Sequence, residues 1–575
     1  MTRTASPPTA LPDRTRWHLG ANAPVAAWLT ALLGITVFDL APATPWLMVH
    51  LLLLGAVTNA IFVWSAHFTD ALLRRRATVG SRRWQVCRLV LLNLGVVTVV
   101  AGMVSDRWFE TLAGSVIVGG AAASHGITLA LHIRRALASR FGATVRYYIC
   151  ASLALPLGAL LGAMLAGHPV DLWHARLVIA HIALNLFGWI GLTVMGTLVT
   201  LWPTMLRTRI AEGAERVARQ ALPILVGSVV VIVTGALGGW QTIAALGVAG
   251  YLAGVVWAVR PMIQVARAKA PSAYATWSVM AAVIWLVGSL AGLVTVLVGS
   301  PTWELVQDRL ELLVTPMTAG FAAQVLLGAL SFLAPVVMGG GPATVRGTQA
   351  RMDRGSAIRS VLINVGLVVY VLPVPGLVRS LVAVLVLGAF AAFLPLLVTA
   401  VLYALRAKTA ARQTPADLTP VTPHVPEPAA VVRGRHTGQA AAALAAVVLA
   451  VAGGVALDPE ALDHDESAPS AVLSTGQVTR VSVVASNMRF VPASVDVPVG
   501  NRLIVVLTNQ SPDVHDLALE TGQITKRIPR GSTTRLDVEV VGANLKGWCT
   551  IAGHRDAGMV FAVNVVNAES KPHSH

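Results

Sequence analysis

Long apolar runs constrain the fold of this 575-residue chain more than any other feature. An α-helix needs about 20 apolar residues to cross the hydrocarbon core of a bilayer. Roughly thirteen runs of that length are present, and they predict a polytopic membrane protein. They lie near residues 22–40, 44–70, 87–105, 110–133, 146–166, 174–204, 220–238, 242–262, 274–299, 311–339, 357–376, 380–405 and 437–457.

The positive charges are distributed unevenly between the loops that join these runs. With the N-terminus placed in the cytoplasm, most of the 43 Lys and Arg residues fall on cytoplasmic segments. This asymmetry follows the positive-inside rule, so the formal charge of +16 reports orientation and predicts no nucleic-acid partner. An odd number of spans then places the C-terminal part outside the cytoplasm. The opposite loops and span edges carry Arg107, Arg176, Arg309 and Arg379.

Changes in composition predict the division of the chain. A Pro-, Thr- and Ala-rich stretch separates the last apolar run from the others and is typical of a flexible linker. After that run, short segments of alternating apolar and polar residues predict an all-β sandwich. The predicted parts are a cytoplasmic tail at 1–21, a twelve-span membrane domain at 22–405, a cytoplasmic linker at 406–436, a tether helix at 437–457, an external linker at 458–475, a β domain at 476–568 and a tail at 569–575.

One internal repeat is visible in the apolar part. The sixth run contains Gly188-x7-Gly196-x6-Pro203, and the tenth contains Gly320-x7-Gly328-x6-Pro335. Because the two runs lie four spans apart, the pattern suggests four-helix units. Small residues at this spacing also serve close helix contact in general, so packing alone explains the pattern equally well.

The segment from 548 to 559 concentrates metal-binding side chains. Cys549, His554 and Met559 are spaced C-x4-H-x4-M, and His515 lies upstream across strand-like sequence. Two imidazoles, one thiolate and a weak axial thioether are the ligand set of a blue, type 1 copper centre. The sequence therefore predicts one copper ion in the β domain, outside the membrane.

The β segment resembles the cupredoxin family, and its ligand loop is similar to those of auracyanins and rusticyanin. The resemblance implies a Greek-key sandwich in which His515, Cys549, His554 and Met559 bind the copper. A dinuclear centre would need a second Cys in the loop, and none is present. A lone type 1 site has no open position for substrate and therefore relays electrons. The other motifs that carry the resemblance are Phe490-Val-Pro492, Val497-Pro-Val-Gly500 and Asn509-Gln-Ser511.

Histidines inside the apolar runs are the second group of candidate ligands. His50 and His181 lie at similar depth on the outer side, and we consider them candidate axial ligands of a haem. The alternative is that His50 is interfacial and that His181 bonds to a neighbouring helix. His125 is a weaker candidate for a second cofactor layer. The residues expected near these candidates are His174 and Arg176 on the outer side, and His67 and His132 on the cytoplasmic side.

The twelve-span block, with His181-Ile-Ala-Leu-Asn-Leu-Phe-Gly-Trp-Ile-Gly191, looks like the haem-copper oxidase subunit I superfamily, which includes the NnrS-type membrane proteins. The resemblance implies three four-helix arcs, with ligands on the second, sixth, seventh and tenth helices. His50 and His181 match the second and sixth. The seventh run lacks a His pair, and Leu313 stands in the tenth where His181 stands in the sixth. An oxygen-reducing binuclear site is therefore not expected.

These features predict a membrane-bound electron-transfer protein. Its external type 1 copper centre would exchange electrons with a bundle that binds haem b, and with an external redox protein or a membrane quinol. The alternative interpretation is a copper-handling membrane transporter or receptor that uses the β domain as an external copper receptor. A terminal oxidase or nitrogen-oxide reductase is the third interpretation, against which the missing His residues argue. Whether the chain is itself an oxidoreductase stays open.

Overall fold

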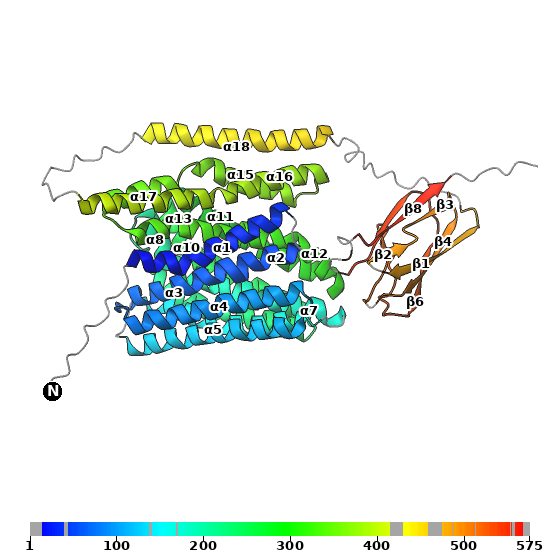
Figure 1. Cartoon of the computed structure of the whole chain (residues 1–575), viewed down its shortest axis with the longest axis horizontal. Helices are drawn as coiled ribbons and strands as arrows, with labels where there is room; N and C mark the ends of the chain where they lie inside the picture. Colours follow the sequence, from blue (N-terminus) through cyan, green and yellow to red (C-terminus); the bar gives the residue numbers. More distant parts are fainter. Residues whose placement is uncertain are drawn as a thin grey trace, which may run out of the picture. The chain divides into compact units, whose positions relative to one another are not determined.

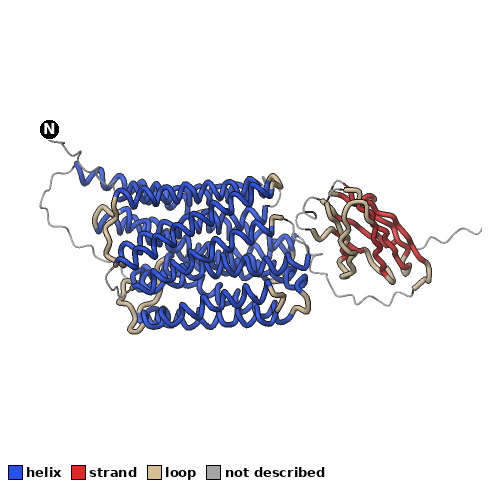
Figure 2. The backbone as a smooth tube through the Cα atoms, turned by 90° about the horizontal axis from the view of Figure 1, so that it is seen from below, coloured by secondary structure: helices blue, strands red, loops and turns tan. Residues whose placement is uncertain are grey.

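Two units make up the computed structural model of this chain, a helical bundle within Met1–Asp458 and a β domain within Pro459–His575. The helices and strands of both are shown in Figures 1 and 2. In the described part of the chain, thirteen helices are long and apolar enough to cross a membrane. The predicted fold class, a bundle of long apolar helices followed by an all-β domain of two sheets, is confirmed. The structure describes residues 14–38, 44–136, 141–167, 171–413, 429–457, 474–486, 488–511, 513–551, 554 and 558–566.

The candidate spans are of two kinds. Most are continuous helices, or pairs of helices joined by short turns. Three are divided into an α-helix, a π-helix and a second α-helix. The first kind comprises α1 (Arg14–Phe38), α4 (Val79–Val104), α5 (Trp108–Arg135), α6 (Gly142–Leu165), α9 (Ala214–Leu237), α10 (Gln241–Ala268), α11 (Tyr274–Gly299), α14 (Pro342–Met352) with α15 (Ser356–Val371), α16 (Gly376–Ala391) with α17 (Phe393–Gln413), and α18 (Ala429–Leu457). The second kind comprises α2 (Thr44–His50), η1 (Leu51–Val57) and α3 (Thr58–Leu72); α7 (Asp171–Ile182), η2 (Ala183–Gly191) and α8 (Leu192–Leu206); and α12 (Trp303–Thr315), η3 (Pro316–Ala323) and α13 (Gln324–Met338).

The three divided spans are the innermost helices of the bundle. Their most apolar stretches are 67%, 78% and 72% buried, whereas those of the other spans are at most 44% buried. Each of the three carries its π-helix inside the span, and such segments often occur at functional positions. In the second and sixth spans the π-helix begins just after a histidine, His50 and His181 respectively.

An internal repeat also appears in hydrogen bonds between helices. The Trp28 indole of α1 donates to the Asn93 side chain of α4 at 2.8 Å, and Asn93 in turn donates to Asn59 of α3. The Trp285 indole of α11 donates to Asn364 of α15, also at 2.8 Å, and Asn364 exchanges hydrogen bonds with Gln324 of α13. The two networks occupy equivalent places in the first and third groups of four spans.

Glycines make room for the two indoles. A Cβ added at Gly55 of η1 would lie 2.8 Å from Trp28, and one added at Gly320 of η3 would lie 2.7 Å from Trp285. Gly188 occupies the matching place in η2, packed against Ala154. The repeat thus links the second span to the sixth and tenth. The sequence pattern had paired only the sixth and tenth, because the second span lacks their glycine spacing.

Several helices extend beyond the predicted apolar runs. The first begins at Arg14, inside the predicted tail at 1–21, and α4 begins at Val79. The predicted linker at 406–436 is partly helical, since α17 continues to Gln413 and α18 begins at Ala429. Hydrophobicity reports where a helix can contact lipid, whereas Arg, Lys, Gln and Ala continue a helix into water at little cost. The predicted external linker lies almost wholly outside the described residues.

The β domain consists of two four-stranded sheets packed face to face. One has the order β2-β1-β4-β6 and the other β3-β8-β7-β5. β1 runs parallel to β4, and β3 runs parallel to β8, while the remaining pairs are antiparallel. Alternate residues of the strands point into one shared apolar core. The strands are β1 (Val478–Ser486), β2 (Arg489–Val491), β3 (Ser494–Pro498), β4 (Arg502–Asn509), β5 (Ala518–Leu519), β6 (Thr533–Val538), β7 (Leu545–Trp548) and β8 (Val560–Val566).

Candidate metal centre

Two segments of the β domain bring the predicted copper ligands to one place. His515 follows β4 and pairs with Ile528 in an isolated β-bridge. Cys549 comes directly after β7, and Met559 directly precedes β8. Because β7 and β8 are antiparallel neighbours, the loop between them must fold back so that its two ends meet.

Backbone hydrogen bonds join the described residues of this loop. The amide of Cys549 donates to the carbonyl of Met559 at 3.1 Å, and the amide of Met559 donates to the carbonyl of His554 at 3.0 Å. The amide of His554 donates to the carbonyl of Ile551 at 3.0 Å. All three sulfur and imidazole residues of the C-x4-H-x4-M motif are therefore held by one short closed loop.

The donor atoms of three predicted ligands lie together. The Nδ1 atoms of His515 and His554 are 3.1 Å apart, and the Sγ atom of Cys549 lies 3.9 Å from the first and 3.6 Å from the second. Two donors on one ion can be separated by no more than the sum of their bond lengths, about 4.0 Å for two nitrogens and about 4.3 Å for nitrogen and sulfur. All three separations meet this limit, so the residues fit a single copper ion. Met559 is fully buried in the same core, and its backbone is bonded to Cys549 and His554.

Burial sets the protonation of these ligands. It raises the pKa of the Cys549 thiol to about 12. It lowers the pKa of His515, against the opposing effect of Asp513 and Asp516, and it lowers the pKa of His554 together with the neighbouring His515. Both imidazoles are therefore kept neutral, as metal ligands must be, whereas the thiol has to release its proton to bind a metal.

A buried carboxylate ties the two ligand segments together. Asp516, which follows His515, is fully buried and accepts a hydrogen bond from the Thr550 amide at 2.6 Å and another from the Thr550 hydroxyl. Thr550 itself follows Cys549, and Arg527 lies 3.3 Å from the Asp516 carboxylate. Asp516 therefore fixes the distance between the first and second ligand.

Ser511 sets the orientation of His515. Its hydroxyl lies 2.7 Å from Nε2 of His515, which leaves Nδ1 as the nitrogen that faces Cys549 and His554. The Ser511 amide donates to the buried Asn509 side chain at 2.9 Å. Sequence reasoning did not assign roles to Asp516 or Ser511. The sequence signal for both is their spacing from a candidate ligand: Asp516 directly follows His515, and Ser511 precedes it by four residues.

Comparisons with known proteins give only short matches to this chain. No family model and no curated protein matches the chain. A reduced auracyanin from the photosynthetic bacterium Roseiflexus castenholzii matches 16% of this chain and 99% of its own, with 16% identity and a TM-score of 0.15. Auracyanin B matches 17% of this chain and 95% of its own, with 17% identity and a TM-score of 0.15. The copper assignment rests on the strand order and the donor distances given above.

In the bundle, the structure brings His50 and His181 together. Their ring centroids are 6.3 Å apart. Nδ1 of His50 bonds to the carbonyl of Trp46 at 2.8 Å, and Nδ1 of His181 bonds to the carbonyl of Gly158 at 2.9 Å. Since a carbonyl only accepts, Nδ1 of His50 carries a proton and its Nε2 atom retains its lone pair. Nδ1 of His181 also lies 3.2 Å from the side-chain nitrogen of Asn185, a donor, so its two neighbours favour opposite tautomers. In either tautomer a neutral imidazole keeps one nitrogen lone pair that can bind a metal.

The other residues expected near this pair have different neighbours. The Arg176 guanidinium lies over the rings of Trp173 and Trp303, at 5.7 and 5.9 Å from their centroids. Among the described residues, the only cluster of three or more His, Cys, Asp or Glu side chains close enough to hold a metal ion is the one in the β domain.

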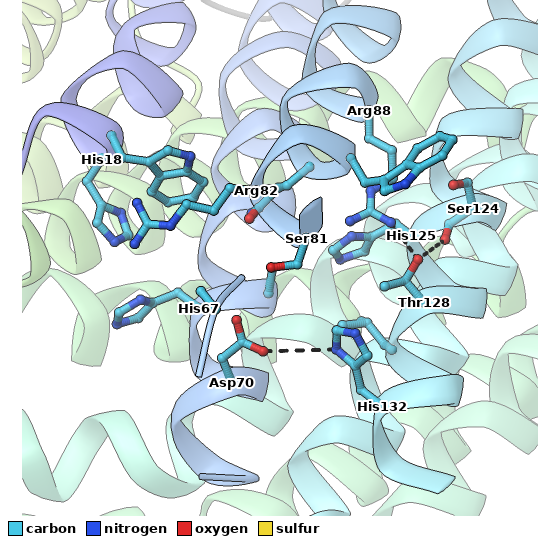
Figure 3. Close-up of a pocket in the computed structure, with 16 residues that line it drawn as sticks. His18, His67, Asp70, Ser81, Arg82, Arg88, Ser124, His125, Thr128 and His132 are labelled. Carbon is cyan, nitrogen blue, oxygen red and sulfur yellow. Dashed lines mark hydrogen bonds and ion pairs between the residues drawn. The ribbon is translucent and has the colours of Figure 1, made fainter. Parts of the chain in front are cut away.

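His125, the weaker candidate, lies away from His50 and His181 and lines a cavity near the basic end of the bundle (Figure 3). It is 1% exposed and stacks on Phe62, with the ring centroids 4.7 Å apart. His18, His67 and His132 line the same cavity. The structure thus gathers the histidines of this end around a cavity rather than around one ion.

Proposed function

We propose that this chain is a membrane-bound electron-transfer protein whose β domain binds one type 1 copper ion. The observation that carries the proposal is the convergence of the Cys549 sulfur with the Nδ1 atoms of His515 and His554 at 3.1 to 3.9 Å. Copper bound by such a donor set alternates between Cu(I) and Cu(II) and so carries one electron at a time.

The surrounding residues suit this function because they keep the ligands still. Asp516 and Ser511 hold the ligand segments through buried hydrogen bonds, so a change in charge at the site requires little movement of the chain. His515 is fully buried, whereas His554 is only half-buried. The His554 edge is therefore the place where an external redox partner would approach.

The distribution of charge supports the orientation. The basic loops, which include Arg74, Arg75 and Arg76, belong in the cytoplasm by the positive-inside rule. With thirteen spans, the β domain would then lie outside, where it would meet a soluble redox protein. A membrane quinol is the other partner that fits an electron carrier in the bilayer.

Haem b in the bundle is the second part of this proposal. His50 and His181 would be its axial ligands, because their Nδ1 atoms lie at hydrogen-bond distance from backbone carbonyls and, as donors to them, would leave both Nε2 atoms to bind iron. Two imidazoles that bind one ion from opposite sides at about 2 Å have ring centres roughly 6 Å apart. The separation of 6.3 Å between the two ring centroids agrees with this.

Metal and haem analysis of the detergent-purified full-length chain tests both parts. We expect copper with a strong visible thiolate-to-copper absorption, and haem with a reduced-minus-oxidised difference spectrum. His181→Ala should remove the haem signal and leave the copper absorption, and His436→Ala, which alters a histidine of α18, should change neither. Copper without haem would refute the haem part alone. A protein that gives no blue absorption after copper loading would refute the whole proposal.

A copper transporter has one supporting observation, because the His50 and His181 pair also suits a copper ion. Copper uptake into vesicles that contain the purified chain distinguishes this function from electron transfer. Uptake that His181→Ala abolishes, in a protein without haem, would favour transport.

A further inference from the structure

The cavity near the basic end of the bundle contains a charged residue that the proposed function does not use. The cavity has a volume of about 320 Å³ and lies between α1, α3, α4 and α5. Arg88 of α4 lines it and is 7% exposed. At 1.5 Å per residue, Arg88 lies about 14 Å along α4 from its first residue, Val79. The apolar run of this helix begins near residue 87, so the buried Arg88 side chain lies where α4 enters the apolar part of the bundle.

The charge of Arg88 is not balanced by a carboxylate in the described part of the chain. Its Nη1 atom donates to the Thr128 hydroxyl, and its Nε atom is buried without a hydrogen-bond partner among the described residues. Asp70 is the only acidic residue that lines the cavity in that part, and its carboxylate lies 4.0 Å from Nδ1 of His132. Figure 3 shows the Arg88 guanidinium beside His125 and Thr128, whereas Asp70 lies next to His132.

A guanidinium keeps its proton in proteins, so Arg88 cannot lose its charge to relieve burial. A buried charge without an opposite charge nearby is unfavourable, and charged residues inside membrane bundles usually pair with one. The side chain thus requires an anion that the described residues do not supply.

His125 adds a second unused polar atom to the cavity wall. The Ser65 hydroxyl donates to the carbonyl of Ile61 at 2.6 Å, so it must accept the hydrogen bond from Nε2 of His125 at 2.8 Å. The proton of the neutral imidazole is therefore on Nε2, and Nδ1 carries the lone pair. Nδ1 of His125 is buried and has no partner among the described residues.

We propose that this cavity binds a phosphate-type oxyanion, with Arg88 as its counter-ion. Guanidinium and phosphate form paired, charge-assisted hydrogen bonds, which would use the unpaired Nε of Arg88. A hydroxyl on the ligand would donate to Nδ1 of His125. The cavity is large enough for a whole phosphate group and part of the molecule that carries it.

The phosphate can belong to a free ion or to a lipid headgroup. A second cavity of about 170 Å³, lined mostly by apolar residues of α1, α13 and α17, shares His18 with the first. It would accept an acyl chain while the headgroup lies beside Arg88. Basic pockets between membrane helices on the cytoplasmic side bind anionic headgroups in this way.

Thermal unfolding of the full-length chain tests the proposal. In detergent without phosphate, added inorganic phosphate should raise the unfolding temperature of the wild type. In nanodiscs, phosphatidylglycerol should do the same relative to phosphatidylcholine alone. Arg88→Gln should weaken binding by about tenfold or more, since hydrogen bonds to charged groups are the stronger ones. Arg83→Gln, which removes an exposed charge from the same helix, should leave binding unchanged.

The experiments with inorganic phosphate and with phosphatidylglycerol distinguish a free ion from a lipid headgroup as the bound ligand. Stabilisation by inorganic phosphate identifies a free-ion site, and stabilisation by phosphatidylglycerol alone identifies a lipid site, provided that Arg88→Gln abolishes either effect. The same shift in Arg88→Gln as in the wild type, or no shift with either ligand, would overturn the proposal. If Arg88→Gln does not fold, Arg88→Lys, which keeps the charge but loses the planar donors, should show a reduced shift; an unreduced one would count against the site.

Discussion

The β domain and the bundle each bring two histidines together, but they do so in different ways. In the β domain the ring centroids of His515 and His554 are 4.9 Å apart, and a thiol joins them. In the bundle those of His50 and His181 are 6.3 Å apart, and each ring is tied separately to a backbone carbonyl. Three donor atoms meet in the first site, whereas the second has two imidazoles and, among the described residues, no third side chain close enough to share a metal ion with them.

The difference follows from the elements that carry the ligands. The β-domain ligands lie on loops whose backbones are hydrogen-bonded to one another, so a shift of one loop moves the other. The two bundle histidines lie on separate helices, α2 and α7, and each is hydrogen-bonded to the backbone of α2 or α6. A closed loop therefore fixes donor distances directly, while a helix pair fixes them only through packing.

The largest expected effect is at Cys549. Cys549→Ser should abolish the blue absorption completely, because a serine hydroxyl stays protonated and gives no thiolate-to-copper charge transfer. Any cofactor of the bundle should remain. The measurement is the visible spectrum with the copper content of the purified chain, and Cys87→Ser, at an exposed thiol, is the control. A blue band that survives Cys549→Ser would show that the sulfur ligand is wrong.

Copper affinity should depend steeply on pH in the β domain. Burial raises the pKa of Cys549 to about 12 and lowers those of His515 and His554 below their ordinary value of 6.5. Between these limits the imidazoles are already neutral and the thiol is still protonated, so binding releases one proton. Affinity should therefore rise about tenfold per pH unit from near neutrality upward.

Competition with a Cu(I) chelator at several pH values, using copper-free full-length protein, measures this slope. As the pH decreases into the acidic range, the affinity should fall more steeply, because the imidazoles also become protonated. An affinity independent of pH above neutrality would mean that the thiol does not lose its proton on binding.

A smaller effect is expected at Asp516, which joins the two ligand segments. Asp516→Ala leaves the Thr550 amide and hydroxyl without their acceptor and should destabilise the copper-loaded β domain by about 2 to 4 kcal/mol. Asp516→Asn keeps one acceptor and should cost less. Loss of the blue absorption in denaturant reports the unfolding. If Asp516→Ala were as stable as the wild type, the hydrogen bonds between Asp516 and Thr550 would not stabilise the contact between the two ligand segments.

The smallest effect is expected from a substitution that tests the pair of His50 and His181 without replacing either histidine. An added Cβ at Gly162 of α6 would lie 2.8 Å from Cε1 of His181, so Gly162→Ala must displace the ring. We expect a loss of about 1 to 3 kcal/mol and an altered haem spectrum, with the blue absorption unchanged.

The matched control is Gly120→Ala, whose Cβ would meet nothing within 4 Å. It should be neutral or slightly stabilising, because alanine favours a helix more than glycine does. Both variants are compared by reduced-minus-oxidised spectra and by thermal unfolding. An unchanged spectrum in Gly162→Ala would argue that His181 does not hold a cofactor.

Much of the architecture could be predicted from sequence because it depends on local patterns. The length of each apolar run predicts a span, and the alternation after residue 476 predicts strands. The C-x4-H-x4-M spacing places Cys549, His554 and Met559 in one loop whatever the rest of the chain does. The loop ends had to meet because the two flanking strands pair, and a sequence of short alternating segments already suggests such pairing.

Other features depended on which distant faces meet, and only the tertiary structure decided them. The hydrogen bonds between Asp516 and Thr550 and the matching networks of Trp28 and Trp285 join residues far apart in the chain. The Arg88 guanidinium, by contrast, meets a hydroxyl of a distant helix and, among the described residues, no carboxylate. Hydrophobic periodicity tells which side of a helix avoids water, but not which neighbour covers that side. The sequence alone therefore determined the elements and the ligand loop, and packing determined how the ligands are supported and which buried charge meets no carboxylate in the described part of the chain.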